Sequence, residues 1–570
     1  MIGVIPKPGQ LEAVEEFFEL FKTPWELHRP EGAYDVIIAT VDEVPEVSTK
    51  LLLAYGSAEK DIDARFGIAA RRRQQGAILS DHDTRLPIYS ELLTFADGSN
   101  GISCATVSSE IAGVTVGSAS LSVIRLGYDL FEEVQFLLSV GQPLEHAHIP
   151  TLEIHIRMLR RWILGAGISL LEIAPAPWHH SFVVCLTHDI DFVGMRNHRF
   201  DHSMWGFVYR ATVGAVRNVV RGRLSLTRLF RSWLAAASLP FVYAGWARDF
   251  WEPFEWYLGV ENGLPVTYFL IPFKRRPGEN VSGFHASRRA TAYDVNDLPH
   301  WTAVLLKRGC ELGVHGIDAW HSAAKGREEL AAIAAVTGES NIGIRMHWLL
   351  RDASTPSVLE RSGYAFDSTF GYNETIGYRA GTGQVFCPLG ARRLLELPLH
   401  IQDGALFFPQ RLDLSERDAE QRCRALIDNA NTFGGVLTIL WHDRSHAPER
   451  FWGDFYVKLL QTLRMLDAWF GTATQVISWF RKRRSVRFER VGPPDSLRTH
   501  LQYEGEEIHP PLRIRVYVPR QRGNDDECSC AATAEYVDLP WNGTSADELE
   551  LQKAAPFSTA LTGLAPSPVR

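Results

Sequence analysis

Short apolar runs that end on ionisable residues recur between residues 182 and 443, and these residues could carry metal-assisted acid–base chemistry. The first such segment is Thr187-His188-Asp189-Ile190-Asp191, which follows the run FVVCL. Two carboxylates separated by one residue can divide the work, one binding a metal ion and the other accepting a proton. The alternative for an isolated Asp-x-Asp is a turn that the aspartates cap at the end of a strand.

The second segment runs from Glu311 to His321 and has His315 directly before a glycine. A glycine at that point lets the chain turn and presents the imidazole in a cleft. Asp318 and His321 are close enough in sequence to join His315 on one divalent cation. The alternative is a structural histidine at a tight turn.

Three further segments supply an arginine, an aspartate and another histidine. Arg345 lies in Gly343-Ile-Arg345-Met-His347-Trp348, and Asp367 follows the run Tyr364-Ala-Phe. Such a pair at neighbouring strand ends can orient a catalytic carboxylate and a catalytic histidine, or can form an ordinary ion pair between loops. His442 ends the run VLTILW and could be a general acid, with a structural histidine as the alternative.

The apolar runs alternate with helical patterns such as SVLERSG and DAEQRCRALIDNA, which predicts parallel strands joined by helices. A β/α barrel builds its active site from residues at the ends of such strands. We therefore expect a barrel-like sheet that brings these side chains together. The predicted strands lie within residues 182–191, 266–271, 310–316, 342–347, 364–369, 394–400 and 436–443.

Other parts of the chain differ in character from this region. The runs AYDVIIATV and KLLLAYG predict strands near the N-terminus, and the stretch from Phe131 to Leu171 has a helical pattern. IRVYVP predicts one strand near the C-terminus, and a polar tail follows that we expect to be disordered. We expect an N-terminal α/β domain of unassigned role, the barrel, a C-terminal extension and the tail, at residues 1–178, 179–483, 484–522 and 523–570.

Taken in order, the five segments resemble the motifs of the polysaccharide deacetylases of the NodB homology type, carbohydrate esterase family four. The resemblance covers roughly residues 180–480, a little over half of the chain. It implies the fold class α/β, with an irregular (β/α) barrel of the NodB-homology type. It also implies Asp189 as the catalytic base, Asp191 and His315 as metal ligands, and a divalent ion, with Zn²⁺ expected.

The remaining motifs complete the implied site with one departure. Arg345 matches the arginine that holds the base, Asp367 the supporting carboxylate, and His442 the acid in Leu-x-His. The family places its second metal-binding histidine four residues after the first, where this chain has Ala319. His321 or Asp318 must then take that role, and we expect His321 because it keeps an imidazole.

The implied reaction removes the acetyl group from an N-acetylated sugar of a polysaccharide or glycan precursor. Asp189 would accept a proton from the attacking water, and His442 would protonate the departing amine. Two alternatives stay open: a catalytically silent homologue that binds glycan, and a hydrolase of a non-sugar amide on the same scaffold.

Composition limits the partners. With 67 acidic and 59 basic residues the formal net charge is −8, so we expect no nucleic acid partner. Yet the segment from Ser203 to Arg248 has seven arginines, eight aromatic residues and no acidic residue. Such a segment can lie on an anionic membrane surface or hold a phosphorylated substrate; alternatively it is a helical insertion at about 200–250 with its arginines solvated or paired.

The cellular location that we expect depends on patterns that the sequence lacks. The N-terminal stretch has no signal-peptide pattern, and no run of about 20 apolar residues occurs. The seven scattered cysteines indicate reduced thiols. We expect a cytoplasmic protein, held at the inner face of the membrane if the Arg-rich segment binds lipid; the sequence does not indicate an oligomeric state.

Overall fold

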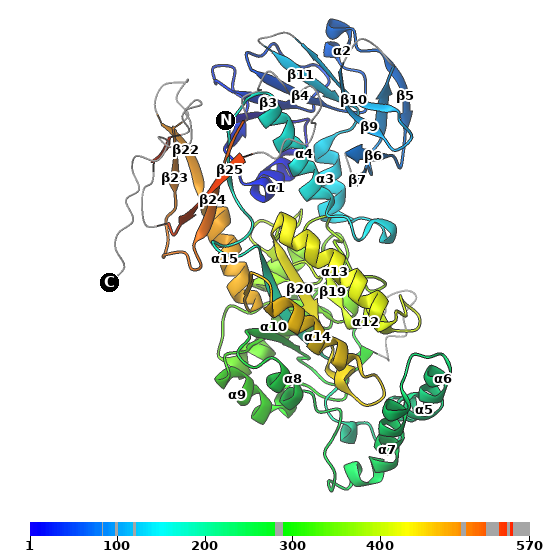
Figure 1. The fold of residues 1–570 in the computed structure, drawn as a ribbon. Coiled ribbons are helices and arrows are strands. Elements are labelled where there is room, and N and C mark those ends of the chain that lie inside the picture. The colour runs from blue at the N-terminus through cyan, green and yellow to red at the C-terminus, as the bar shows by residue number, and fades with distance from the viewer. Residues whose placement is uncertain are drawn as a thin grey trace. The chain divides into compact units, whose positions relative to one another are not determined.

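The computed structural model describes residues 1–81, 84–96, 101–117, 121–279, 289–491, 498–519, 535–543 and 548–550. The chain divides into two compact units (Figure 1). The first comprises residues 1–134, 152–174 and 481–570, and the second residues 135–151 and 175–480. The segment 484–522, which we expected as a separate extension, therefore belongs to the first unit. Three helices contain a boundary between the units: α3 (Leu130–Ser139), α4 (Thr151–Gly165) and α15 (Ala473–Ser485).

The second unit is built on one parallel sheet, in the order β18-β17-β16-β15-β14-β13-β20-β19, with β21 beside the start of β13. β18 and β19 form the two ends of this order and do not pair with each other, so the sheet is a half-barrel where we expected a barrel. Its strands are β13 (Phe182–Ile190), β14 (Val266–Leu270), β15 (Glu311–Gly316), β16 (Ile344–Met346), β17 (Phe366–Asp367), β18 (Leu395–Glu396), β19 (Ile401–Gln402), β20 (Val436–Leu440) and β21 (Ala468–Phe470).

Helices connect these strands, as the alternating pattern predicts. In α13, for example, the Ser415 hydroxyl accepts a hydrogen bond from the backbone N–H of Asp418 at the start, and Gly434 follows the last residue with φ 81°. The helices of this unit are α5 (His202–Tyr209), α6 (Ala215–Val220), α7 (Leu226–Tyr243), α8 (Phe254–Val260), α9 (Pro299–Lys307), α10 (Ala323–Thr337), α11 (Thr355–Ser362), α12 (Asp403–Phe407), α13 (Glu416–Phe433) and α14 (Trp452–Arg464).

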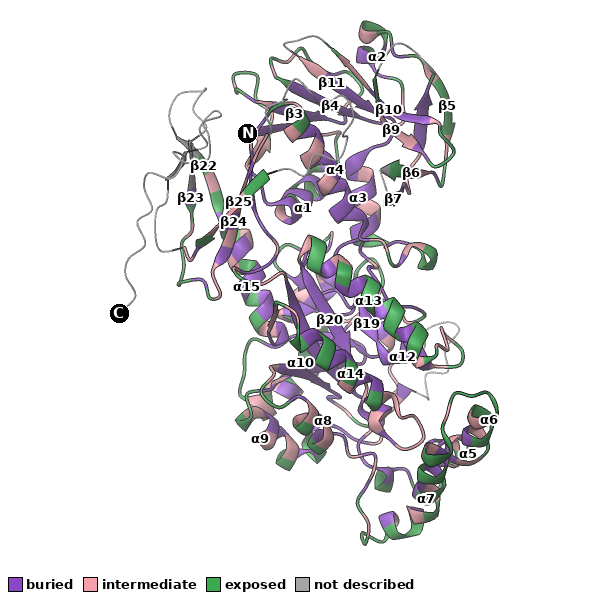
Figure 2. Cartoon of the chain, viewed as in Figure 1, coloured by how far each residue is buried: buried purple, intermediate pink, exposed green. Residues whose placement is uncertain are grey.

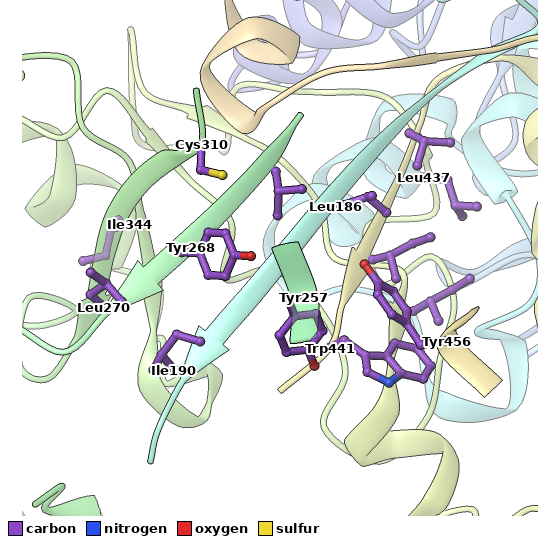
Figure 3. Packing of buried hydrophobic residues seen from close by; sticks show 14 of the residues in the cluster. Leu186, Ile190, Tyr257, Tyr268, Leu270, Cys310, Ile344, Leu437, Trp441 and Tyr456 are labelled. Carbon is purple, nitrogen blue, oxygen red and sulfur yellow. The ribbon is translucent and has the colours of Figure 1, made fainter. Parts of the chain in front are cut away.

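The core of the second unit is built around β13, the longest strand of the sheet. All nine of its residues are buried, as expected for a parallel strand covered on both faces. Figure 3 shows Leu186 and Ile190 of this strand with Tyr268 of β14. On the β20 side, the Trp441 ring stacks on Tyr456 with centroids 5.0 Å apart. This packing fixes the strand ends from which the ionisable residues project.

The first unit has a mixed sheet of eleven strands. The two strands predicted near the N-terminus are β3 and β4, which pair in parallel. The sheet contains β1 (Ile2–Ile5), β2 (Trp25–Leu27), β3 (Val36–Ala39), β4 (Leu51–Tyr55), β5 (Ala70–Gln74), β6 (Ile78–Asp81), β7 (Thr84–Pro87), β8 (Leu92–Phe95), β9 (Gly101–Thr106), β10 (Ile111–Gly117) and β11 (Ser122–Leu126). The helices α1 (Leu11–Phe21) and α2 (Asp61–Phe66) also belong to this unit.

Two small sheets complete the first unit, and they include strands from the segment that we expected to be a disordered tail. β12 (Leu170–Ile173), β24 (Leu512–Val518) and β25 (Glu535–Trp541) form one, and β22 (Arg487–Val491), β23 (Arg498–Gln502) and β26 (Glu548–Glu550) the other. β25 and β26 lie in the segment 523–570 that we expected to be disordered. β25 is held because it pairs along its whole length with β24, and Asp538 accepts two hydrogen bonds from Arg515. Apart from residues 542 and 543, the rest of the predicted tail is outside the described residues.

A buried hydrogen-bond network connects the second unit's sheet to its helices. Glu261, directly after α8, accepts hydrogen bonds from His188 of β13 and from the Tyr456 hydroxyl of α14. The other ring nitrogen of His188 lies 2.7 Å from the backbone oxygen of Trp441. Because these groups are withdrawn from water, each depends on its protein partner.

Replacement of Glu261 by alanine should therefore destabilise the half-barrel by about 3–5 kcal/mol, since the partners stay buried without it. Glu255→Ala on α8 is the matched control: Glu255 is 66% exposed and pairs with Arg248, so about 0–1 kcal/mol is expected. Urea unfolding followed by tryptophan fluorescence measures both. Equal shifts for the two variants would contradict the structural role of the network.

Candidate metal and catalytic site

Ionisable residues from five strands meet at one edge of the parallel sheet. The carboxyl ends of parallel strands lie at the same edge, which brings together side chains that are far apart in sequence. The residues are Asp189 and Asp191 at the end of β13, His315 in β15, Arg345 and His347 at β16, Asp403 after β19 and His442 after β20.

Three of these residues form a candidate metal site. The Asp191 Oδ1 atom lies 3.2 Å from His315 Nε2 and 3.4 Å from His347 Nε2, and the three ligand atoms lie within 4.8 Å of one another. Among the described residues this oxygen is buried without a hydrogen bond. His315 Nδ1 is 3.0 Å from the Arg345 carbonyl, which can only accept, so in the neutral ring Nε2 carries the free lone pair. One carboxylate and two imidazoles suit a divalent ion such as Zn²⁺.

The charge states of this cluster also suit a metal. Burial alone would raise the pKa of Asp191, but the imidazoles of His347 and His315 hold it well below its usual range. Burial lowers the pKa of His347 to about 3. Both side chains are therefore deprotonated near neutral pH, the state in which they bind metal.

His321, the expected third ligand, lies elsewhere. Its Nε2 atom is 3.5 Å from Asp318 Oδ1 and 3.6 Å from a carboxylate oxygen of Glu279. Asp318 in turn lies 3.1 Å from Lys325 Nζ and accepts a hydrogen bond from the backbone of Glu279. The structure thus brings His347, and not His321 or Asp318, to Asp191 and His315.

Packing explains why the second imidazole comes from another strand. Ala319, at the position where the resembled deacetylase motif has a histidine, is fully buried in the hydrophobic core. A Cβ atom at Gly326 of α10 would lie only 3.4 Å from the Ala319 Cβ, so the helix packs too closely for a larger side chain. His315 pairs in register with Arg345, and His347 follows two residues later. The neighbouring strand therefore supplies an imidazole at the same edge.

Asp189 is held by a fully buried arginine. Arg345 Nη1 donates to Asp189 Oδ1 at 3.0 Å and to the Thr187 hydroxyl at 2.8 Å. The second oxygen of Asp189 lies 3.9 Å from His315 Nε2. Arg345 thus fixes one carboxylate oxygen and leaves the other directed toward the candidate metal site, which suits a proton acceptor.

His442 is held by a buried carboxylate that the sequence did not indicate. Its Nδ1 atom lies 2.5 Å from Asp403 Oδ1, and its backbone N–H donates to Asp403 Oδ2 at 2.9 Å. Burial alone would lower the pKa of His442, but Asp403, with smaller contributions from Asp191 and Asp189, raises it to about 9. The ring is a cation near neutral pH, so His442 can donate a proton.

Asp367, the expected supporting carboxylate, does not contact His442. It is buried opposite Glu396 in the register of β17 and β18, and it accepts a hydrogen bond from the backbone N–H of Thr369 at 3.0 Å. Burial raises the pKa of Asp367 and of Glu396. Asp403 orients His442 instead, because β19 lies beside β20 and ends next to His442.

The site is open to solvent at two of its residues. The side chains of Asp191 and His442 are 18% and 21% exposed, whereas that of Asp189 is 4% exposed. Asp443, the residue after His442, is buried. Its Oδ1 atom accepts a hydrogen bond from the backbone N–H of Asp191, and burial raises the pKa of Asp443 to about 7. Asp191 and His442 are thus accessible from solvent, while Asp189 is shielded.

Sequence reasoning missed two of these residues for different reasons. His347 stands two positions after Arg345 in a segment already singled out, and its place at a strand end was a usable signal. Asp403 had no such signal, because it follows a strand of only two residues, Ile401 and Gln402. Its role depends on the pairing of β19 with β20.

Comparisons with known proteins found distant matches among solved structures. No family model and no curated protein matches the sequence. A "putative polysaccharide deacetylase" from Mycobacterium smegmatis matches with 17% identity over 56% of this chain and 99% of that chain, at a TM-score of 0.33. A "probable Polysaccharide deacetylase" from Pseudomonas aeruginosa PAO1 matches with 13% identity over 53% and 92%, at 0.31.

A third structure, of Puue allantoinase, matches with 13% identity over 53% of this chain and 91% of that chain, at a TM-score of 0.33. Two of these three structures are described as polysaccharide deacetylases. At these identities and TM-scores the likeness determines neither a family nor an activity.

The geometry of the cluster predicts which variants lose metal. Asp191→Ala, His315→Ala and His347→Ala should each abolish stoichiometric Zn²⁺ binding, because each removes one of three converging ligand atoms. His321→Ala is the matched control and should bind Zn²⁺ like the parent protein. Titration calorimetry and metal analysis after dialysis measure both. Retained metal in His347→Ala together with loss in His321→Ala would restore the ligand set expected from the sequence.

Proposed function

We propose that the chain is a metal-dependent hydrolase that removes the acetyl group from an N-acetylated sugar of a polysaccharide or glycan precursor. The observation that carries this proposal is that a proton acceptor and a proton donor lie beside the same cluster of three ligands. Asp189 is a carboxylate with one free oxygen, and His442 is a cation near neutral pH. A base and an acid beside one ligand cluster are the groups that amide hydrolysis requires.

Asp191, His315 and His347 would hold the divalent ion, for which Zn²⁺ is favoured by the donor set. Lewis acidity toward the acetyl carbonyl is the chemistry that such an ion would supply when bound. The remaining steps belong to the chain's own residues.

Asp189 acts first as the base. Its Oδ2 atom accepts a proton from the water whose oxygen forms a bond to the carbonyl carbon. Arg345 keeps the carboxylate in place by its hydrogen bond to Oδ1, so Oδ2 needs no reorientation during the reaction. Positioning of this kind lowers the barrier because the order is present before substrate binds.

His442 acts second as the acid. The carbon–nitrogen bond breaks, and the imidazolium donates its proton to the departing nitrogen. Before that step Asp403 stabilises the imidazolium through the hydrogen bond between its Oδ1 atom and His442 Nδ1. The Nε2 atom of His442 is therefore the proton donor. The products are acetate and a sugar with a free amino group.

The geometry of the site also bears on two alternatives to a sugar deacetylase. A catalytically silent glycan-binding homologue was suggested by Ala319, but His347 supplies an imidazole from the neighbouring strand and so favours an enzyme. A hydrolase of a non-sugar amide would use the same residues. The motif resemblance supports the acetylated sugar as substrate, and a panel of both classes of amide separates the two.

Substitution of the base and the acid tests the proposal. Asp189→Asn and His442→Ala should each lower acetate release from an acetylated oligosaccharide by about 10²–10⁴-fold, the usual contribution of a positioned base or acid. Both variants should keep Zn²⁺, since neither residue belongs to the ligand cluster. Acetate release at the parent rate in both variants would contradict the roles. No release by the parent protein across acetylated sugars, with metal present, would support the binding homologue.

The pH dependence tests the link between Asp403 and His442. Because the acid must be protonated, activity should fall as the pH rises through the pKa of His442, about 9. Asp403→Asn removes the charge that stabilises the imidazolium, so the pKa falls and the alkaline limb should move to lower pH. Profiles of kcat/KM for both proteins measure the shift. An unchanged alkaline limb would assign it to another group.

A further inference from the structure

The Arg-rich segment forms a helical hairpin on the second unit. α5 continues through a π-helical turn (Arg210–Gly214) into α6, and α7 returns beside them (Figure 1). We call residues 202–243 the hairpin. α7 is anchored to the half-barrel by Arg228, which pairs with Glu416 and Asp454, and by Ser232, whose hydroxyl donates to the Pro448 carbonyl.

Each arm of the hairpin exposes a stripe of large apolar side chains. Of the 20 large hydrophobic residues that are exposed among the described residues, 12 lie from Phe200 to Trp246. The first stripe has the three- and four-residue spacing of one helix face: Trp205, Tyr209, Val213, Val216 and Val220. The second lies on α7: Leu226, Phe230, Trp233, Leu234 and Phe241.

The opposite faces of the same helices are buried, as the alternation of purple and green along them indicates (Figure 2). Met204, Phe207 and Ala211 of the first arm pack in one cluster with Leu239 and Val242 of α7. α5 and α7 are therefore apolar on two faces, one used for packing and one left in contact with water. Large apolar side chains that gather on one part of a protein surface mark sites of interaction.

The charges of the hairpin favour one class of partner. Arg217, Arg221 and Arg231 are exposed, and none of them has an acidic group within 4 Å among the described residues. No acidic residue occurs between Ser203 and Arg248. Two copies of this surface would repel each other, whereas an anionic surface would neutralise it.

We propose that the hairpin docks on an anionic phospholipid surface. Tryptophan, tyrosine and phenylalanine rings beside arginines suit the boundary between headgroups and acyl chains. Within the described part of the chain, no helix combines the length and apolar character needed to cross a bilayer. The contact is thus interfacial, with the apolar stripes in the boundary and the unpaired arginines on lipid phosphates.

The hairpin is rooted beside the catalytic residues. β13 ends at Ile190, Asp191 follows, and the short helix Met195–Asn197 leads into α5. The chain returns at Asp249, whose carboxylate accepts hydrogen bonds from the backbone N–H groups of Met195 and Arg196. Docking would therefore hold the candidate site near the lipid headgroups, where a membrane-borne acetylated glycan is within reach. The docking itself does not depend on the proposed activity.

Vesicle sedimentation of the full chain tests the proposal. The protein should sediment with vesicles of phosphatidylcholine and phosphatidylglycerol, and much less with phosphatidylcholine alone. Substitution of Arg217, Arg221 and Arg231 by glutamine should weaken binding on the order of a hundredfold, since each removes one contact to the anionic surface. Phe230→Ser with Leu234→Ser should weaken it by at least about tenfold.

Matched controls separate docking from general charge and exposure. Arg392, Arg393 and Arg424 are exposed elsewhere on the same unit, and their replacement by glutamine should leave binding unchanged, as should Met465→Ser at a residue that is 86% exposed. Absence of binding to anionic vesicles, or equal loss in the control triple variant, would overturn the proposal. So would self-association in ultracentrifugation that Phe230→Ser with Leu234→Ser abolishes while vesicle binding persists.

Discussion

The arrangement of the candidate site depends on Arg345, a guanidinium without access to water. It donates to Thr187 and Asp189 at the end of β13 and to the backbone and hydroxyl of Ser368 after β17. Its charge also lies over the Phe269 ring of β14, 4.6 Å from the centroid. A buried cation must have such partners, because burial without them is costly. One side chain thus fixes three strand ends relative to each other.

The sequence allowed the parallel strands and most of their end residues to be predicted, because apolar runs that stop on ionisable residues are a local signal. Asp189, Asp191, His315, Arg345 and His442 lie at one edge of the sheet for that reason. The partners of these residues depend on strand order, which is not local. Asp403 reaches His442 only because β19 lies beside β20, and Asp367 is turned toward Glu396 by the pairing of β17 with β18.

The remaining differences from expectation also come from long-range pairing. The composition of residues 523–570 indicates disorder, yet β25 gains hydrogen bonds along β24 and an ion pair between Arg515 and Asp538. The strands at the two ends of the half-barrel are short, and the sequence pattern could not show that they stay apart. Averages over a segment miss a short strand whose partner lies elsewhere in the chain.

The hairpin is closed at its base, and this has an evolutionary consequence. The backbone N–H of Gly194 donates to the Trp251 carbonyl at 3.3 Å, and Asp249 binds the chain just after Gly194. The entropic cost of closing a loop grows only slowly with its length. Insertions of very different length and character can therefore be accommodated here during evolution, while Asp191 keeps its place.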